Sequence, residues 1–219
     1  MSSSDRLYSS PTGGWPTPSV HIRTGCEVTY LATGKITKRI EEIGSKKRTQ
    51  IEDLYITENS PDGVSGKKVR LLTHYDVDGN MNGKAQALFV VKEKTADSIA
   101  GRYTTTSVLL LPSEYNLLKR RLSGRHGCRR VAKVRVSLGD NLGHAYVYMG
   151  ELSGLVTVTI KGLEYGDEYL QLVDTPPNGC LSTRPFSAHF SGESLSGKRY
   201  KDIEPYLIRL GYVKQDCAI

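Results

Sequence analysis

Much of the chain alternates apolar and polar residues with the period of two that is typical of half-buried β-strands. In the segment VHIRTGCEVTY, which begins at Val20, the residues Ile22, Cys26, Val28 and Tyr30 share one parity with Val20. Further strand-like runs cover residues 51–57, 67–76, 84–91, 104–111, 131–138, 144–149, 155–161 and 168–173. Asp-Gly and Asn-Gly pairs between the second and third of these runs predict a hairpin turn.

The run at 131–138 is the most regular of these predicted strands. We expect its apolar side chains to face the core and Lys133 and Arg135 to face solvent. If this strand pairs with the run at 144–149, Tyr146 and Tyr148 lie beside those two cations.

Three short segments have helical spacing instead. Isoleucines recur at 36, 40 and 43 before Gly44, a second helix is expected to start with Ser113 as its N-cap, and a third covers residues 200–210. Because strands do not alternate with helices, we expect an α+β fold, mostly antiparallel β with two or three short helices. Residues 20–219 are expected to form a single β-rich globular domain, preceded by a flexible Ser/Pro/Gly-rich arm at residues 1–19.

Composition narrows the class of protein. The chain has 219 residues, 38% hydrophobic and 24% charged, which is typical of a soluble globular protein. Its four cysteines are scattered, no signal peptide is expected, and the longest apolar run, at 108–111, is too short to span a bilayer. We therefore expect a cytosolic protein that is not secreted.

The charge of the chain favours a negatively charged partner. The formal net charge is +7 and the pI about 9.2, and between residues 119 and 139 no acidic residue interrupts a run of cations. We predict that this run forms one anion-binding patch on a helix end, a loop and the outer face of a strand, made of Lys119, Arg120, Arg121, Arg125, Arg129, Arg130, Lys133 and Arg135. A secondary basic group consists of Lys38, Arg39, Lys46, Lys47 and Arg48.

Motifs for catalysis or metal binding are not evident. The sequence contains none of the G-x-S-x-G, H-E-x-x-H, G-x-x-x-x-G-K-[ST] and G-x-G-x-x-G motifs. The loop that begins at Asp78 resembles half of an EF-hand loop, but Phe89 occupies the position of the bidentate glutamate. We therefore expect a protein that is not an enzyme, with no catalytic residues, no metal, no cofactor and no small-molecule substrate.

Two C-terminal segments carry a resemblance to a known family. Residues 148–160, YMGELSGLVTVTI, and 200–214, YKDIEPYLIRLGYVK, resemble the C-terminal part of rhabdovirus matrix proteins. The resemblance implies a viral structural protein of matrix type that self-associates and bridges an anionic membrane and a ribonucleoprotein. Such a protein would be found in the host cytoplasm and at the inner face of the virion envelope. The arm lacks the Pro-Pro-x-Tyr motif of that family.

Three other interpretations remain open. An RNA-binding viral accessory protein, such as a movement protein or a silencing suppressor, would use the same patch on single-stranded RNA. A β-sandwich capsid component would bring the patch to the packaged genome. An enzyme whose active site is dispersed along the sequence would leave no local motif.

Overall fold

The computed structural model describes residues 20–44, 48–56, 65–76, 78, 80–83, 85–94, 102–123, 128–139, 143–163 and 166–217. The predicted arm at 1–19 lies outside these residues, as do Lys46, Lys47 and Arg125. None of the helices in the described part of the chain is both long and apolar enough to cross a membrane.

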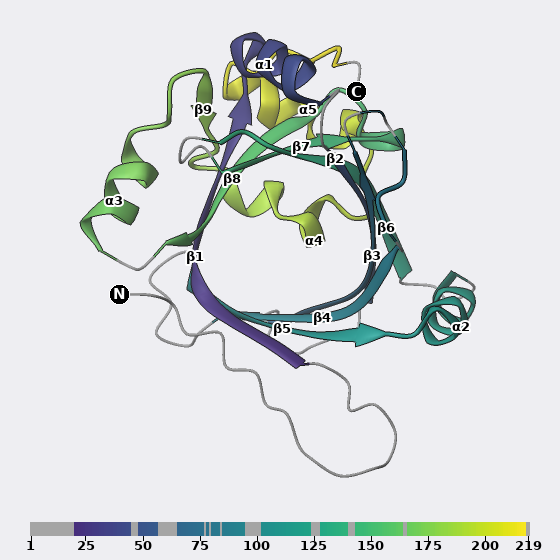
Figure 1. The fold of residues 1–219 in the computed structure, drawn as a ribbon. Helices are drawn as coiled ribbons and strands as arrows, with labels where there is room; N and C mark the ends of the chain where they lie inside the picture. The colour runs from purple at the N-terminus through teal and green to yellow at the C-terminus, as the bar shows by residue number, and fades with distance from the viewer. Residues whose placement is uncertain are drawn as a thin grey trace.

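Eight antiparallel strands close into a barrel (Figure 1). Their order around the barrel is β5-β4-β3-β2-β6-β7-β8-β1, and β5 pairs with β1 to close the ring. The strands are β1 (Val20–Ala32), β2 (Arg48–Ile56), β3 (Ser65–Tyr75), β4 (Gln86–Lys94), β5 (Arg102–Leu110), β6 (Cys128–Ser137), β7 (His144–Tyr148) and β8 (Val156–Leu163). The expected fold class, an α+β domain, is therefore wrong, because the strands form one closed barrel.

The long first strand makes the closure possible. Its first half, from Val20 to Cys26, pairs with β5, and its second half, from Cys26 to Leu31, pairs with β8 along the opposite edge. The register shifts between Cys26 and Glu27, so β1 bends where it passes from one partner to the other. A short ninth strand, β9 (Cys180–Ser182), pairs with the end of β1.

Helices cover parts of the outer surface of the barrel (Figure 1). In α1 (Gly34–Gly44), Ile36 and Ile40 are buried in a cluster with Val134 and Val136 of β6, and α2 (Pro112–Ser123) packs its apolar face on β2, β3 and β4. Burial of each such isoleucine contributes about 1.5–3 kcal/mol. The second helix begins at Pro112, one residue before the expected N-cap Ser113.

The segment 168–173, expected to be a strand, belongs to helix α3 (Asp167–Asp174). Tyr169 and Val173 are four residues apart, and both pack on Cys26 on the outer side of β1. The helical spacing of these two side chains decides the conformation, because an apolar surface on β1 is available to cover them. The strand prediction for this segment is therefore wrong.

The residues that follow β9 fill part of the barrel interior. They include η2 (Ser187–Phe190), α4 (Gly192–Leu195) and α5 (Tyr200–Arg209). Earlier in the chain, η1 (Gly150–Leu152) joins β7 to β8. Phe190, Leu195 and Ile203 are buried in one cluster with the interior-facing Tyr55 and Val131, and Figure 1 shows α4 within the ring of strands. The strands therefore have an apolar environment on both sides, except where charged side chains face inward.

The parity of β6 is confirmed but its orientation is the reverse of the prediction. Val134 and Val136 pack outward beneath α1. Lys133 is buried and reaches Asp53 on the inner face of the neighbouring strand β2, and Arg135 lies on the same inner face. In a closed barrel the outer surface under a helix is a core, so the apolar parity of a strand can face away from the barrel axis.

Candidate functional site

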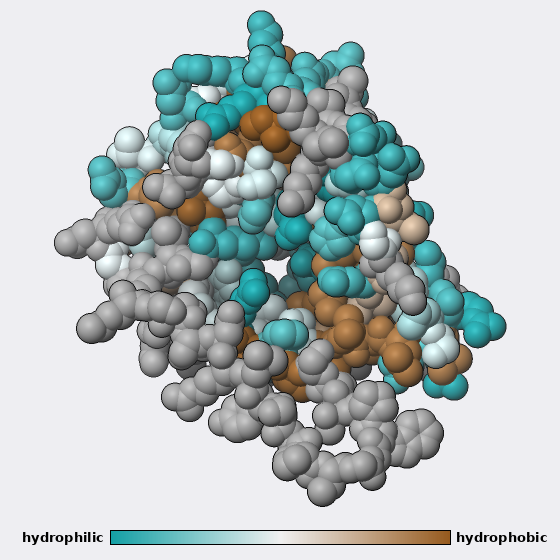
Figure 2. Space-filling view, in the orientation of Figure 1, coloured by the Kyte–Doolittle hydropathy of each residue, from teal (hydrophilic) through white to brown (hydrophobic). Residues whose placement is uncertain are grey.

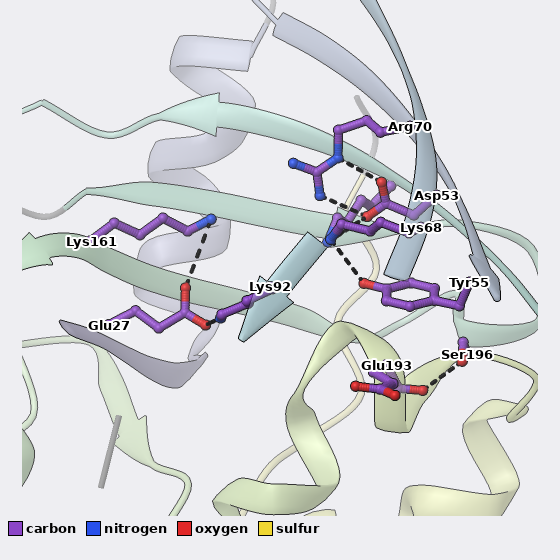
Figure 3. Close-up of polar contacts among 10 residues, drawn as sticks. Glu27, Asp53, Tyr55, Lys68, Arg70, Lys92, Lys161, Glu193 and Ser196 are labelled. Carbon is purple, nitrogen blue, oxygen red and sulfur yellow. Dashed lines mark hydrogen bonds and ion pairs between the residues drawn. The ribbon is translucent and has the colours of Figure 1, made fainter. Parts of the chain in front are cut away.

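A buried carboxylate in β2 holds three cations inside the barrel. The side chain of Asp53 has no exposed surface, and Arg70 contacts both of its oxygens, Nε to Oδ1 at 2.6 Å and Nη2 to Oδ2 at 2.7 Å. Lys68 Nζ lies 3.4 Å and Lys133 Nζ 3.8 Å from Oδ2. The paired contacts from Arg70 fix the plane of the carboxylate, since a guanidinium binds a carboxylate with two parallel hydrogen bonds. Figure 3 shows Arg70 and Lys68 converging on Asp53.

Strand register explains this convergence. Asp53 is the partner of Arg70 in the β2–β3 ladder, and Lys68 is the partner of Tyr55. Residues two apart on a strand face the same side, so Lys68 and Arg70 enter the interior from one strand while Asp53 and Tyr55 enter from the next. Lys68 Nζ also donates to the Tyr55 hydroxyl at 3.2 Å.

A second carboxylate, Glu27 in β1, is held in the same way. Lys92 of β4 contacts Glu27 Oε1, and Lys161 of β8 lies 3.9 Å from Oε2 (Figure 3). Lys161 is the partner of Glu27 in the β1–β8 ladder, and Lys92 belongs to a strand that does not pair with β1. Glu27 of β1 therefore links β4 and β8 on the inside of the barrel.

Tyrosine rings separate these cations. Lys133 Nζ lies 4.7 Å and Lys161 Nζ 5.6 Å from the centroid of the Tyr146 ring. Lys92 Nζ lies 4.0 Å from the Tyr103 centroid. Each ring presents its negative face to an ammonium group, which stabilises cations that burial alone would disfavour. We call eight charged side chains on the inner faces of the strands the interior cluster: Lys68, Arg70, Lys92, Lys133, Arg135 and Lys161 with Glu27 and Asp53. Glu193 of α4 also lies near them, beside Tyr55 (Figure 3).

The pKa values of this cluster reflect an excess of positive charge. Burial would raise the pKa of Asp53, but Lys68, Arg70 and Lys133 hold it well below its ordinary range. Burial and the charge of Arg70 lower the pKa of Lys68 well below that of an ordinary lysine, although Asp53 opposes the change. The pKa of Lys133 is also lowered, first by burial and, among its charged neighbours, by Arg70 and Lys161, with Asp53 again opposing.

The pKa of the Tyr146 phenol also reflects the positive charge around it. Burial would raise the pKa of its phenol, yet the pKa is lowered because Lys161, Lys133, Arg70 and Arg135 stabilise the phenolate. Other tyrosines behave differently: burial raises the pKa of Tyr30 to about 12, and it also raises the pKa of Tyr55, Tyr103 and Tyr148, which face the interior. The reversal is therefore local to Tyr146. A field strong enough to reverse the effect of burial on a phenol would also attract a larger anion.

The interior opens to solvent on the face of the molecule that Figure 2 shows. Figure 2 looks along the barrel in the orientation of Figure 1 and shows an opening near its centre, bordered largely by hydrophilic residues. The exposed fraction of the lysine side chains is 41% for Lys161 and 34% for Lys92, but 13% for Lys68 and 8% for Lys133. The cluster therefore runs from accessible cations to buried ones, as a binding chamber with an entrance would.

The eight residues of the predicted basic patch do not form one surface. Lys133 and Arg135 point into the barrel, whereas Lys119 and Arg130 share the outward-facing Glu52, at 3.3 and 3.0 Å. Arg120, Arg121 and Arg129 are exposed, and Arg125 lies outside the described residues. The single outer patch is therefore corrected, because the wall of the barrel separates its members. Binding to membranes or to RNA through the exposed arginines, and self-association, stay predictions.

The secondary basic group is also divided. Arg39 Nη2 donates to the carbonyl oxygen of Leu138 at 2.8 Å, and the Arg48 guanidinium lies 5.4 Å from the Tyr75 ring centroid. Lys38 is exposed on α1, and the other two lysines of the group lie outside the described residues.

Sequence reasoning missed most of the interior cluster. Of its six cations, only Lys133 and Arg135 were predicted as site residues, and both were placed on the outer face. The other members are charged residues on the inward-facing parity of five strands, at positions 27, 53, 68, 70, 92 and 161. The available signal was that six strands each carry a charge on that parity, which indicates a shared polar interior once the strands are known to close.

Comparisons with known proteins give only distant structural likenesses. No family model and no curated protein matches the sequence. The PH1819 protein from Pyrococcus horikoshii OT3 is 15% identical with a TM-score of 0.45, over 89% of this chain and 94% of that chain. A putative adenylyl cyclase from Hippeastrum, HpAC1, described as having a dominant triphosphatase activity, is 8% identical with a TM-score of 0.39, over 67% of this chain and 82% of that chain.

The expectation that the chain is not an enzyme is corrected at this point. It rested on the lack of local motifs, whereas the strands assemble charged groups that are far apart in the sequence. A missing motif is therefore no ground for excluding catalysis by this chain, and neither likeness extends to the identity of its family.

Proposed function

We propose that the interior cluster binds a compact polyanion with several phosphate groups, such as inorganic tripolyphosphate or the triphosphate of a nucleotide. The observation that carries this proposal is the charge balance of the inner face, where six cationic side chains of the strands outnumber Asp53, Glu27 and the nearby Glu193 of α4. The proposal rests on these residues of the chain and not on the distant structural likenesses.

The cations repel one another in the absence of such a ligand. Burial is the main cause of the lowered pKa values of Lys68 and Lys133, and the neighbouring Arg70 and Lys161 add to both shifts, although Asp53 opposes them. Buried like charges destabilise a fold unless a counter-charge is present. A polyanion in the chamber would supply that counter-charge, so ligand binding and relief of repulsion favour each other.

The enclosure of the cluster selects for a small ligand. Its cations come from β3, β4, β6 and β8, which lie on different sides of the barrel. A ligand inside would be contacted from several directions, whereas the backbone of a nucleic acid duplex requires an open surface or groove. Arg70 and Arg135 offer planar donors to phosphate oxygens, and the lysines offer point charges.

The same arrangement favours a reaction at a phosphoanhydride. Phosphoryl transfer is accelerated chiefly by positioning and by fixed positive charge around the oxygens on which negative charge develops. Cations anchored on rigid strands provide such charge without reorganisation. Hydrolysis of the bound anhydride, with release of phosphate, is therefore the reaction class that we propose.

Calorimetry with inorganic tripolyphosphate tests binding, and release of orthophosphate tests hydrolysis. Lys161→Gln removes an accessible cation of the cluster, and Lys201→Gln, on the exposed side of α5, is the matched control. We expect the first substitution to weaken binding about tenfold, since a charge-assisted hydrogen bond contributes roughly 1.5–3 kcal/mol, and the second to leave it unchanged. Equal affinity in both variants would overturn the assignment of the ligand to the barrel interior.

A further inference from the structure

Every carboxylate oxygen of the interior cluster already faces a cation. Asp53 Oδ1 accepts from Arg70, and Asp53 Oδ2 faces Arg70, Lys68 and Lys133. Glu27 Oε1 contacts Lys92, and Glu27 Oε2 faces Lys161. A divalent cation would have to displace a lysine or an arginine from its counter-charge in order to reach Asp53 or Glu27. Glu193 of α4, which lies near Tyr55 (Figure 3), could add one carboxylate ligand from the inside of the ring.

The positions beside Glu27 supply neutral groups. On the inner face of β1 and β8, Thr29 and Thr159 are cross-strand partners whose hydroxyl oxygens lie 3.2 Å apart. Among the described residues, no group of three or more His, Cys, Asp or Glu side chains could hold a metal ion. Hydroxyls beside one engaged carboxylate are a poor ligand set for Mg²⁺, which takes carboxylate and phosphate oxygens in octahedral geometry.

Electrostatic repulsion also disfavours Mg²⁺ in this chamber. Mg²⁺ in a phosphate site serves to neutralise the negative charge of the phosphates. In this barrel Lys161, Lys133, Arg70 and Arg135 already lie around Tyr146, and they lower the pKa of its phenol despite burial, as a metal ion would. A further dication at the same place would be repelled by them.

We infer that the barrel binds its polyphosphate ligand as the metal-free anion, with the fixed lysines and arginines in the place that Mg²⁺ takes in other phosphate sites. This inference rests on the proposed function and names the ionic form of its ligand. Mg²⁺ then competes with the protein for tripolyphosphate, because each protein-bound ligand must first lose its metal.

The test is calorimetric titration of the full chain with inorganic tripolyphosphate in two solutions. One contains EDTA and the other excess MgCl₂, with KCl adjusted to equal ionic strength because salt screens the same attraction. We expect the dissociation constant in EDTA to be at least tenfold lower than in MgCl₂. The Lys161→Gln variant should bind more weakly in EDTA, which places the metal-free complex at the cluster.

The possible failures are distinguishable. Equal or tighter binding in MgCl₂ would overturn the inference of a metal-free ligand and leave the proposed polyphosphate site in place. A lack of binding in both solutions would overturn the proposed function together with the inference.

Discussion

Asp53 is the residue on which the interior cluster depends most directly. It has no exposed surface and contacts cations from β3 and β6. A buried carboxylate that neutralises several cations is difficult to replace, because its removal leaves those cations desolvated and unpaired. The neighbouring Glu52 faces the opposite side of the same strand and pairs with the more exposed Lys119 and Arg130, so the two acids make a matched comparison.

We expect Asp53→Asn to lower the free energy of unfolding by about 3–5 kcal/mol, and Glu52→Gln to lower it by about 0–1 kcal/mol. Urea denaturation measures both. Because the pKa of folded Asp53 lies below its ordinary 3.8, its contribution to stability is present above that pH and is lost as the pH falls below it. The variant should lack this acid-dependent loss. Equal destabilisation by the two substitutions would show that the interior ion pairs contribute no more to the free energy of unfolding than the outer ones.

Tyr146 is a natural probe of the interior field. Its pKa is lowered despite burial by the four cations around it, so it should ionise before Tyr30, whose pKa is raised to about 12. In an alkaline titration followed by tyrosinate absorbance, Tyr146→Phe should remove the earliest transition. Saturating tripolyphosphate should shift that transition to higher pH, because the bound anion offsets the cations. An earliest transition that survives in the variant would contradict this assignment.

At the level of single strands, sequence periodicity is informative about which residues share a side but not about which side that is. In β6 the alternation of Val134 and Val136 with Lys133 and Arg135 was recognised, but its cations were expected in solvent. The rule that polar residues face water applies to a sheet with one covered face. It fails here because α1 covers the outer face and the polar side chains meet across a closed ring.

Closure itself could not be predicted from local patterns. Most strands, the hairpin between β3 and β4, α1 and α5 lie near their expected positions. The pairing of β1 with β5, across more than seventy intervening residues, is a long-range contact with no local signature. Glu27 and Lys92 meet only through this closure. Their contact in the site therefore could not be predicted from the sequence, for the same reason as the closed fold.

The short helix α4 supports the cluster from inside the barrel. A Cβ atom added at Gly192 would overlap the hydroxyl of Tyr55, and it would lie 3.9 Å from Lys133 Nζ. Tyr55 in turn accepts from Lys68. Glycine therefore allows the backbone of α4 to rest directly on the residues that position two cations.

We expect Gly192→Val to destabilise the fold by about 1–3 kcal/mol through overpacking and to weaken tripolyphosphate binding, because Tyr55 and Lys68 must move. Gly166→Val, where an added Cβ meets nothing within 4 Å, is the control for a change of glycine. Thermal denaturation and calorimetry give the two readouts. Normal stability and normal binding in the first variant would mean that α4 yields to the side chain without affecting the cluster.

For the whole molecule, the net charge of +7 conceals two different distributions. Exposed cations such as Arg120 and Arg121 lie on helix α2, and solvent and salt screen their interactions. Lys68 and Lys133 of the interior cluster are largely shielded from solvent, and burial first and neighbouring cations second lower their pKa values. Only the second distribution couples ligand binding to protonation.

We therefore expect tripolyphosphate binding to take up protons. In the free protein, burial and neighbouring cations lower the pKa of Lys68 and of Lys133 below the ordinary 10.5, although Asp53 opposes both shifts. A bound polyanion raises both values, so between the free and bound pKa values each lysine gains a proton on binding, and affinity falls as the pH rises through that range. Calorimetry in buffers of different ionisation enthalpy measures the uptake as a slope, which should be smaller in Lys68→Met. A slope of zero at every pH from neutrality to 10.5 would contradict the coupling, even if the ligand binds, because fully protonated lysines would have no proton to gain.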